Sequence, residues 1–217
     1  MPTSSNQIFP KWVNKTPLIL AGSLPLVTVG LIGAVWYYFS PKFKDVGYAP
    51  KQPVPYSHKL HAGELGLDCR YCHFSVETNA KANVPPTQVC MNCHKNVKTE
   101  SPALAPVRES WEKDTPVEWI KVHKIPDHAQ FTHAPHMNAG VGCVSCHGRI
   151  DQMPVVSLQE PLSMSWCLDC HRDPAPHLRP KALITKMDWE PTDADKKNAE
   201  ALAATLKAPT HCSGCHR

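Results

Sequence analysis

The sequence predicts a loop-rich domain of short α-helices, preceded by a single N-terminal transmembrane helix. Proline is frequent, at 22 of 217 residues, and each proline fixes φ and removes a backbone hydrogen-bond donor. Long helices and a large sheet are therefore not expected beyond the N-terminal segment. The ten cysteines fall into five C-x-x-C pairs, a regularity typical of a covalent or metal framework. The formal charge of +4 is too small to favour nucleic-acid binding.

The uncharged stretch at residues 18–39, LILAGSLPLVTVGLIGAVWYYF, is long enough to cross a bilayer. As a helix rising about 1.5 Å per residue it measures roughly 33 Å, against a hydrocarbon core of about 30 Å. Trp36, Tyr37 and Tyr38 lie at its C-terminal end, where an interfacial aromatic belt is expected. A cleaved signal peptide is less well supported, because its apolar core covers only about 7–15 residues. We expect a retained anchor over residues 18–40.

A histidine follows every cysteine pair at once. C-x-x-C-H is the attachment signature of c-type haem: the two thiols form thioethers with the haem, and the histidine binds the iron from the proximal side. The sequence therefore predicts five covalently bound haem c groups, numbered 1 to 5 in chain order. Their cysteines are Cys69 and Cys72, Cys90 and Cys93, Cys143 and Cys146, Cys167 and Cys170, and Cys212 and Cys215; their proximal histidines are His73, His94, His147, His171 and His216.

Zinc sites and disulfides explain the cysteine pattern less well. A zinc ribbon gathers two C-x-x-C pairs per metal and does not need a histidine after each pair. Five pairs would also leave one pair without a partner. A disulfide inside C-x-x-C closes a very small loop and restrains little of the unfolded chain.

Two stretches repeat a longer order of residues: an aromatic, H-x-x-H, a glycine-containing spacer and C-x-x-C-H. They are YSHKLHAGELGLDCRYCH at 56–73 and FTHAPHMNAGVGCVSCH at 131–147. Low-spin haem iron takes a sixth, distal ligand, and two histidines on one helical turn can point their rings at neighbouring irons. We expect each H-x-x-H pair to serve its own haem and one other. The opening aromatics, Tyr56 and Phe131, pack either on a porphyrin face or in an ordinary core.

This order of residues resembles the class III multihaem cytochromes, the cytochrome c3 and c7 families. In those families F-x-H-x-x-H ahead of C-x-x-C-H supplies distal ligands to two different haems. The resemblance implies that His58 caps haem 1 and His133 caps haem 3. His61 and His136 would cap other haems, most simply haems 2 and 4.

Haem 5 needs a distal ligand from outside the two H-x-x-H pairs. His123 is the favoured candidate, and Met164, in LSMSWCLDCH, is the alternative, since His/Met ligation raises the reduction potential relative to His/His. His177 and His211 are weaker candidates, because His211 directly precedes the fifth motif and is poorly placed to reach the far face of that haem. His128 has no motif support and is interpreted as a surface histidine.

The motif spacing also predicts the domain organisation. Residues 41–55, PKFKDVGYAPKQPVP, form a proline-rich tether to a pentahaem domain at 56–217. Two closely spaced pairs of motifs and one terminal motif indicate dihaem modules at about 56–115 and 120–180, with the fifth haem within 181–217. Five haems are expected to take the place of a conventional hydrophobic core.

One helix near the C-terminus can be predicted from its own sequence. The stretch TDADKKNAEALAATLK, residues 192–207, places Thr192 where an N-cap is expected. Ala199, Leu202, Ala203 and Leu206 recur at helical spacing and form its apolar side.

Haem chemistry decides the expected orientation in the membrane. Lysines flank both ends of the hydrophobic stretch, so the positive-inside rule gives no clear preference. Haem c is attached outside the bacterial cytoplasm, which places the haem domain on the periplasmic or extracytoplasmic side. We therefore expect a single-pass protein of the bacterial inner (cytoplasmic) membrane, with residues 1–17 in the cytoplasm.

Three functions suit a membrane-anchored multihaem chain. The first is an electron wire, in which every iron has two protein ligands and no substrate binds. The second is a quinol dehydrogenase that feeds periplasmic reductases, although such families usually begin their haem motifs soon after the helix. The third is a multihaem reductase, which needs an iron with an open face and often shows an unusual motif. All five motifs here are ordinary, so we expect no catalytic residue in this chain.

The whole arrangement resembles the pentahaem cytochrome c subunit of bacterial alternative complex III. The resemblance is carried by the N-terminal anchor, YSHKLHAGELGLDCRYCH, VHKIPDHAQFTHAPH, MSWCLDCHR and the C-terminal C-x-x-C-H. Position 128 departs from it, because histidine stands where an aromatic residue is expected after Pro-Asp. The resemblance implies respiratory electron transport from menaquinol, with electrons passing from an iron–sulfur protein subunit through this chain. The implied partners are polytopic quinol-binding membrane subunits, a monohaem cytochrome c and a haem–copper oxidase downstream.

Overall fold

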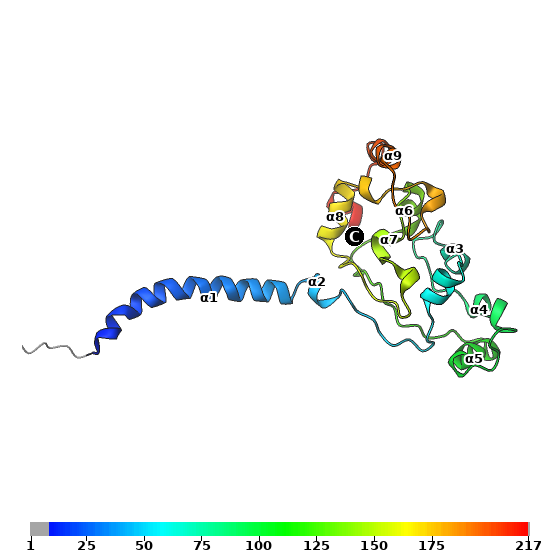
Figure 1. The fold of residues 1–217 in the computed structure, drawn as a ribbon, viewed down its shortest axis with the longest axis horizontal. Helices are drawn as coiled ribbons and strands as arrows, with labels where there is room; N and C mark the ends of the chain where they lie inside the picture. The colour runs from blue at the N-terminus through cyan, green and yellow to red at the C-terminus, as the bar shows by residue number, and fades with distance from the viewer. Residues whose placement is uncertain (1–8, 217) are drawn as a thin grey trace, which may run out of the picture. The chain divides into compact units, whose positions relative to one another are not determined.

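The computed structural model describes residues 9–216, which form two separate units (Figure 1). The first unit belongs to Met1–Lys44 and the second to Asp45–Arg217.

The N-terminal unit consists of one long helix and two short ones. The 3₁₀ helix η1 (Lys11–Lys15) leads into α1 (Thr16–Tyr38), and α2 (Pro41–Lys44) follows. Proline lies in the first turn of α1, where its missing N–H costs nothing, and Pro25 lies inside the helix. The continuous helical stretch Trp12–Tyr38, 27 residues, is long and apolar enough to cross a membrane. The stretch predicted as an anchor, residues 18–40, is helical as far as Tyr38.

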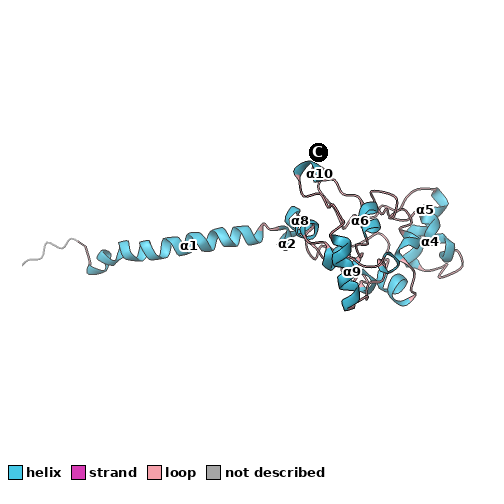
Figure 2. Cartoon of the chain, turned by 90° about the horizontal axis from the view of Figure 1, so that it is seen from above, coloured by secondary structure: helices cyan, strands magenta, loops and turns pink. Residues whose placement is uncertain are grey.

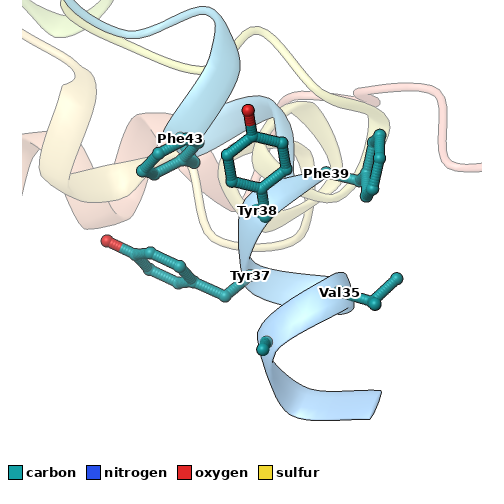
Figure 3. A pocket seen from close by; sticks show the side chains of 6 residues that line it. Val35, Tyr37, Tyr38, Phe39 and Phe43 are labelled. Atoms are coloured by element: carbon teal, nitrogen blue, oxygen red, sulfur yellow. The ribbon is translucent and has the colours of Figure 1, made fainter. Parts of the chain in front are cut away.

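Aromatic side chains gather at the C-terminal end of α1. The ring of Phe43 lies 5.3 Å from that of Tyr37 and 5.0 Å from that of Tyr38, measured between centroids. Figure 3 shows these rings with Val35 and Phe39 around a small apolar pocket. Amphipathic rings at a helix end suit a membrane–water boundary, as the sequence predicts for this position.

The second unit contains only short helices joined by loops (Figure 2). Within residues 45–216 there is no β-strand, and the extended contacts are two isolated bridges, Ala129 with His216 and Val141 with Leu178. The predicted fold class, irregular with short helices and one apolar N-terminal helix, is confirmed. The helices are η2 (Lys59–Glu64), α3 (Cys69–Cys72), α4 (Thr87–His94), η3 (Pro102–Leu104), α5 (Ala105–Lys113), α6 (His133–Ala139), α7 (Val144–His147), η4 (Ile150–Gln152), α8 (Met164–Arg172), η5 (Ala175–His177), η6 (Lys181–Leu183), α9 (Asp193–Ala203) and α10 (Cys212–Cys215).

The protein core of this unit is small. Its buried apolar cluster is made of Val76, Met137 and Ile184, which are 8%, 7% and 3% exposed. No side chain of the described residues is more than 98% buried. A unit of this length ordinarily buries more apolar surface than that, so side-chain packing alone stabilises it weakly.

The predicted C-terminal helix is present as α9, but it ends at Ala203, so Leu206, expected on its apolar side, lies beyond it. The hydroxyl of Thr192 accepts a hydrogen bond from the backbone N–H of Asp195, and the Asp195 carboxylate accepts one from the backbone N–H of Thr192. This reciprocal capping box satisfies two backbone donors at the helix start. Ala199, one of the residues predicted for its apolar side, is buried.

The two H-x-x-H pairs lie on helical turns of different kinds. The second pair, His133 and His136, lies on the regular helix α6. In the first pair, His58 caps the π-helix η2 and His61 lies within it. Gly63 in η2 packs directly on the carbonyl of Asp151 in η4, where no Cβ would fit. Because η2 is a wide π turn that packs on the backbone of η4, its position sets the direction of the His61 side chain.

Candidate haem-binding sites

Each C-x-x-C-H motif lies on a short helix or at its start. The motifs occupy α3, α4, α7 with its preceding residue Cys143, α8, and α10. On one helical turn, residues three apart share a face, so both thiols of a motif point the same way with the histidine beside them. None of the ten cysteines pairs in a disulfide. Thioether attachment of a planar group to two thiols and one imidazole needs this local arrangement.

Backbone carbonyls orient most of the motif histidines. When Nδ1–H donates to a carbonyl, the ring direction is fixed and the lone pair of Nε2 stays available for a metal. Four proximal histidines have such a contact: His73 Nδ1 to Asn83 O at 2.6 Å, His94 to Val97 O at 3.0 Å, His171 to Pro209 O at 2.7 Å and His216 to His128 O at 3.3 Å.

Three distal candidates are oriented in the same way, and two of them repeat one geometry. His61 Nδ1 lies 2.9 Å from the carbonyl of Ser57, and His136 Nδ1 lies 2.7 Å from that of Thr132. In both copies the acceptor is four residues earlier. His133 Nδ1 instead contacts Ala80 O at 2.9 Å, which is backbone of the first module. The internal duplication seen in the sequence therefore extends to hydrogen bonding.

Three proximal rings each face a second imidazole at about the spacing that one iron requires. Two imidazoles that bind a metal ion from opposite sides hold their ring centres roughly 6 Å apart, because each nitrogen–metal bond is about 2 Å long. The measured centroid distances are 6.3 Å for His61 and His94, 6.0 Å for His136 and His171, and 5.8 Å for His128 and His216.

A fourth pair, His123 with His147, is tighter. The ring centroids are 4.4 Å apart, and Nε2 of His123 lies 3.3 Å from Nδ1 of His147. Burial, together with the neighbouring His123, His133, His73 and His58, lowers the pKa of His147 to about 3. Burial followed by His73 lowers the pKa of His58 to about 4. His58, His123, His133 and His147 thus form one partly buried cluster with lowered pKa values, which favours the neutral imidazole that binds metals.

The aromatic that opens each module packs on both of its histidines. Tyr56 meets His58 edge-on at 4.9 Å and stacks on His61 at 4.4 Å. Phe131 lies 4.7 Å from both His133, edge-on, and His136, tilted by 33°. Contacts of this kind hold the two imidazoles of a pair in different directions. The repeated aromatic therefore positions histidine rings, a role that the sequence reasoning did not assign to it.

The five motifs adjoin one another in the order 2, 1, 3, 4, 5. Asn92 of motif 2 donates to the Tyr71 hydroxyl of motif 1 at 3.1 Å, and the Cys69 thiol of motif 1 contacts the Cys143 thiol of motif 3. His136, which precedes motif 3, lies 6.0 Å from His171 of motif 4, measured between ring centroids. Burial together with Cys170 and Cys167 of motif 4 raises the pKa of the Cys146 thiol of motif 3 to about 12.

The link from motif 4 to motif 5 has two parts. The His171 ring of motif 4 bonds to the carbonyl of Pro209, three residues before Cys212 of motif 5. Burial raises the pKa of the Cys167 thiol in motif 4, and the Cys215 thiol of motif 5 also raises it. The order of the motifs in space therefore differs from their order in the chain only by exchange of the first two.

The structure places the sequence-predicted distal ligands as follows. His61 lies beside His94, the proximal histidine of haem 2, and His136 lies beside His171, the proximal histidine of haem 4. These are the haems to which the two histidines were most simply allotted. His58 and His133 both lie near His73 and His147, the proximal histidines of haems 1 and 3 to which they were allotted. His123 lies at His147, although the sequence allotted it to haem 5, and Met164 is 64% exposed. His128, interpreted from the sequence as a bland surface residue, lies at His216.

Comparison with known proteins gives one relative of assigned function. No protein-family model matches the chain. The chain is 28% identical over 193 residues, 87% of its length, to the menaquinone reductase multiheme cytochrome c subunit of Nitratidesulfovibrio vulgaris (strain Hildenborough), and covers 78% of that relative. This likeness supports a multihaem cytochrome c. It also supports a quinol-linked electron-transfer role, and it does not single out alternative complex III.

The residues of a multihaem cytochrome c are in place and fit covalent haem c. Every motif offers two free thiols and a following imidazole. Seven motif or distal histidines have Nδ1 on a carbonyl, and three ring pairs have a spacing that suits an iron between them. The small protein core agrees with a fold in which bound groups provide much of the packing.

Proposed function

We propose that this chain is a membrane-anchored pentahaem electron wire in a respiratory complex linked to menaquinol, of the alternative complex III kind. The observation that carries the proposal is the set of five C-x-x-C-H motifs in spatial sequence, with second histidines opposite the proximal rings of haems 2, 4 and 5. In the proposal all ten motif cysteines form thioethers. The five histidines that follow them are proximal ligands.

The chain's own residues position the cofactors. A c-type haem, when bound, accepts and releases one electron at its iron, at a potential tuned by the axial ligands. The backbone carbonyls at Ser57, Thr132 and Ala80 hold distal rings, and Tyr56 and Phe131 pack on them. His58, His61, His133 and His136 then leave no open iron for a substrate at the haems that they cap. This ligand set favours a wire over a reductase.

The contacts between motifs support a linear path. With motifs adjoining in the order 2, 1, 3, 4, 5, electrons enter near one end of the row and leave near the other. Haem-to-haem transfer is reversible, so the same row serves menaquinol oxidation or, as the name of the relative says of that protein, menaquinone reduction. The partners at its ends set the direction.

The proposed setting is the bacterial inner membrane. The helix Trp12–Tyr38 has the length and apolarity of an anchor, and haem attachment puts the second unit on the periplasmic side. In the proposal, an iron–sulfur protein subunit delivers electrons, and a monohaem cytochrome c or a haem–copper oxidase receives them. The polytopic subunits that bind the quinol contact the anchor. The quinol dehydrogenase that feeds periplasmic reductases is the second candidate, because the likeness to a quinone-linked relative fits it too.

The test is purification of the chain from the membranes of its native host through an N-terminal tag. Intact mass is expected to exceed that of the polypeptide by five haem groups, and an iron–sulfur protein and polytopic subunits are expected to co-purify. Menaquinol added to the complex is expected to reduce the haems. Isolation of the chain without partners, with haems that menaquinol leaves oxidised, would refute the proposal.

A further inference from the structure

His128 has no role in the sequence motifs, yet the structure sets its ring beside the proximal histidine of motif 5. The centroids of His128 and His216 are 5.8 Å apart, and their planes differ by 21°. We propose that His128 is the distal iron ligand of haem 5. This inference rests on the proposed five-haem function, because it needs a haem on Cys212 and Cys215.

The ring spacing supports this assignment. The distance at His216 matches those at His94 and His171, which are 6.3 Å and 6.0 Å. The histidines facing those two rings come from H-x-x-H pairs, so they are distal candidates on independent grounds.

Backbone contacts hold the two residues together across 88 positions of the chain. Ala129 and His216 form an antiparallel bridge, and the N–H of Gln130 donates to the carbonyl of Cys215 at 2.7 Å. Nδ1 of His216 lies 3.3 Å from the carbonyl of His128. The N–H of Ala129 closes a turn onto the carbonyl of Pro126 at 2.9 Å. The position of His128 at motif 5 therefore follows from main-chain pairing and does not depend on one exposed side chain.

The imidazole of His123 contacts that of His147, with 3.3 Å between their ring nitrogens, so it serves the buried cluster around haems 1 and 3. Met164 is the first residue of α8, behind the N-cap Ser163, and it is 64% exposed. With His128 at haem 5, the cluster offers His58, His123 and His133 to two irons.

The experiment uses the full-length holoprotein in its purified complex, with His128→Ala as the variant. Low-temperature EPR of the oxidised protein is expected to show one of five haems converted from low spin to high spin, with five haems still present by mass. Added imidazole is expected to return that haem to low spin. His128→Met is expected to keep five low-spin haems, to produce the near-infrared band of His/Met ligation and to raise one reduction potential.

The affected haem is located with Cys212→Ala/Cys215→Ala, which removes haem 5. In that background His128→Ala is expected to add no high-spin signal. His211→Ala is the matched control, because it removes another histidine beside motif 5 and is expected to leave every haem low spin.

The outcomes separate the two proposals. A parent protein without a haem on motif 5 overturns the pentahaem function and this assignment together. A parent with five low-spin haems whose His128→Ala variant stays low spin overturns the assignment alone. So does a high-spin haem produced by His123→Ala or Met164→Ala that disappears when haem 5 is removed.

Discussion

Substitution of Met137 by alanine tests whether the small apolar cluster holds the second distal pair in place. Met137 lies on α6 directly after His136, is 7% exposed, and packs with Val76 and Ile184. Buried methionine-to-alanine changes cost about 2–5 kcal/mol, depending on how far the cavity collapses. The loops around this cluster can close in part, so we expect a loss of about 2–3 kcal/mol. For a domain of this size that lowers Tm by roughly 5–10 °C.

The assay is thermal unfolding of the holoprotein followed by far-ultraviolet circular dichroism, with EPR of the same samples. Met164→Ala is the control, because this methionine is 64% exposed and is expected to shift Tm by less than about 1 °C. We also expect the EPR signal of haem 4 to broaden in Met137→Ala, since α6 carries His136 toward His171. Equal Tm values for the two variants would show that haem attachment, and not this cluster, positions α6.

Three further predictions concern local structure. Gly63→Ala places a Cβ against the Asp151 carbonyl and is expected to displace η2. The low-spin EPR signal of haem 2 is then expected to change, and an unchanged spectrum would show that the π turn has no part in orienting His61. Thr192→Ala removes the capping box of α9 and is expected to lower the free energy of unfolding by about 1 kcal/mol, measured by denaturant unfolding. Thr205→Ala, at an exposed position, is the control, and equal losses of unfolding free energy in the two variants contradict the role of the cap. Asp68→Asn tests acid stability: hydrogen bonds from Arg70 lower the pKa of Asp68 to about 2, below its usual value of 3.8, so its stabilisation is present above about pH 4 and is lost as pH falls toward 2. Because that side chain is 41% exposed, we expect less than about 1 kcal/mol between variant and parent at pH 6, vanishing by about pH 2; a difference that persists there refutes the assignment.

Features that depend on neighbours in the chain were predictable from the sequence. The apolar N-terminal helix, the capped helix at α9 and the irregular fold with short helices follow from hydrophobicity, capping residues and proline content. The haem motifs belong to the same class, because thioether attachment and proximal ligation use five consecutive residues. The π-helical turn at His61 was not predictable, since it depends on packing of η2 against η4.

Which histidine rings lie near one another was decided by tertiary structure. Composition and spacing offered eight histidines beyond the proximal five, and a histidine can reach any iron that the fold brings to it. Main-chain pairing of residues 128–130 with motif 5 brings His128 to His216, and burial brings His123 to His147. These contacts join residues 24 and 88 positions apart, and no local pattern specifies them. The sequence by itself therefore indicated a chain with five haem-attachment motifs and one apolar helix long enough to cross a membrane. Only the folded chain decided which rings face one another, because ligand pairing depends on distances that periodicity and motif spacing do not contain.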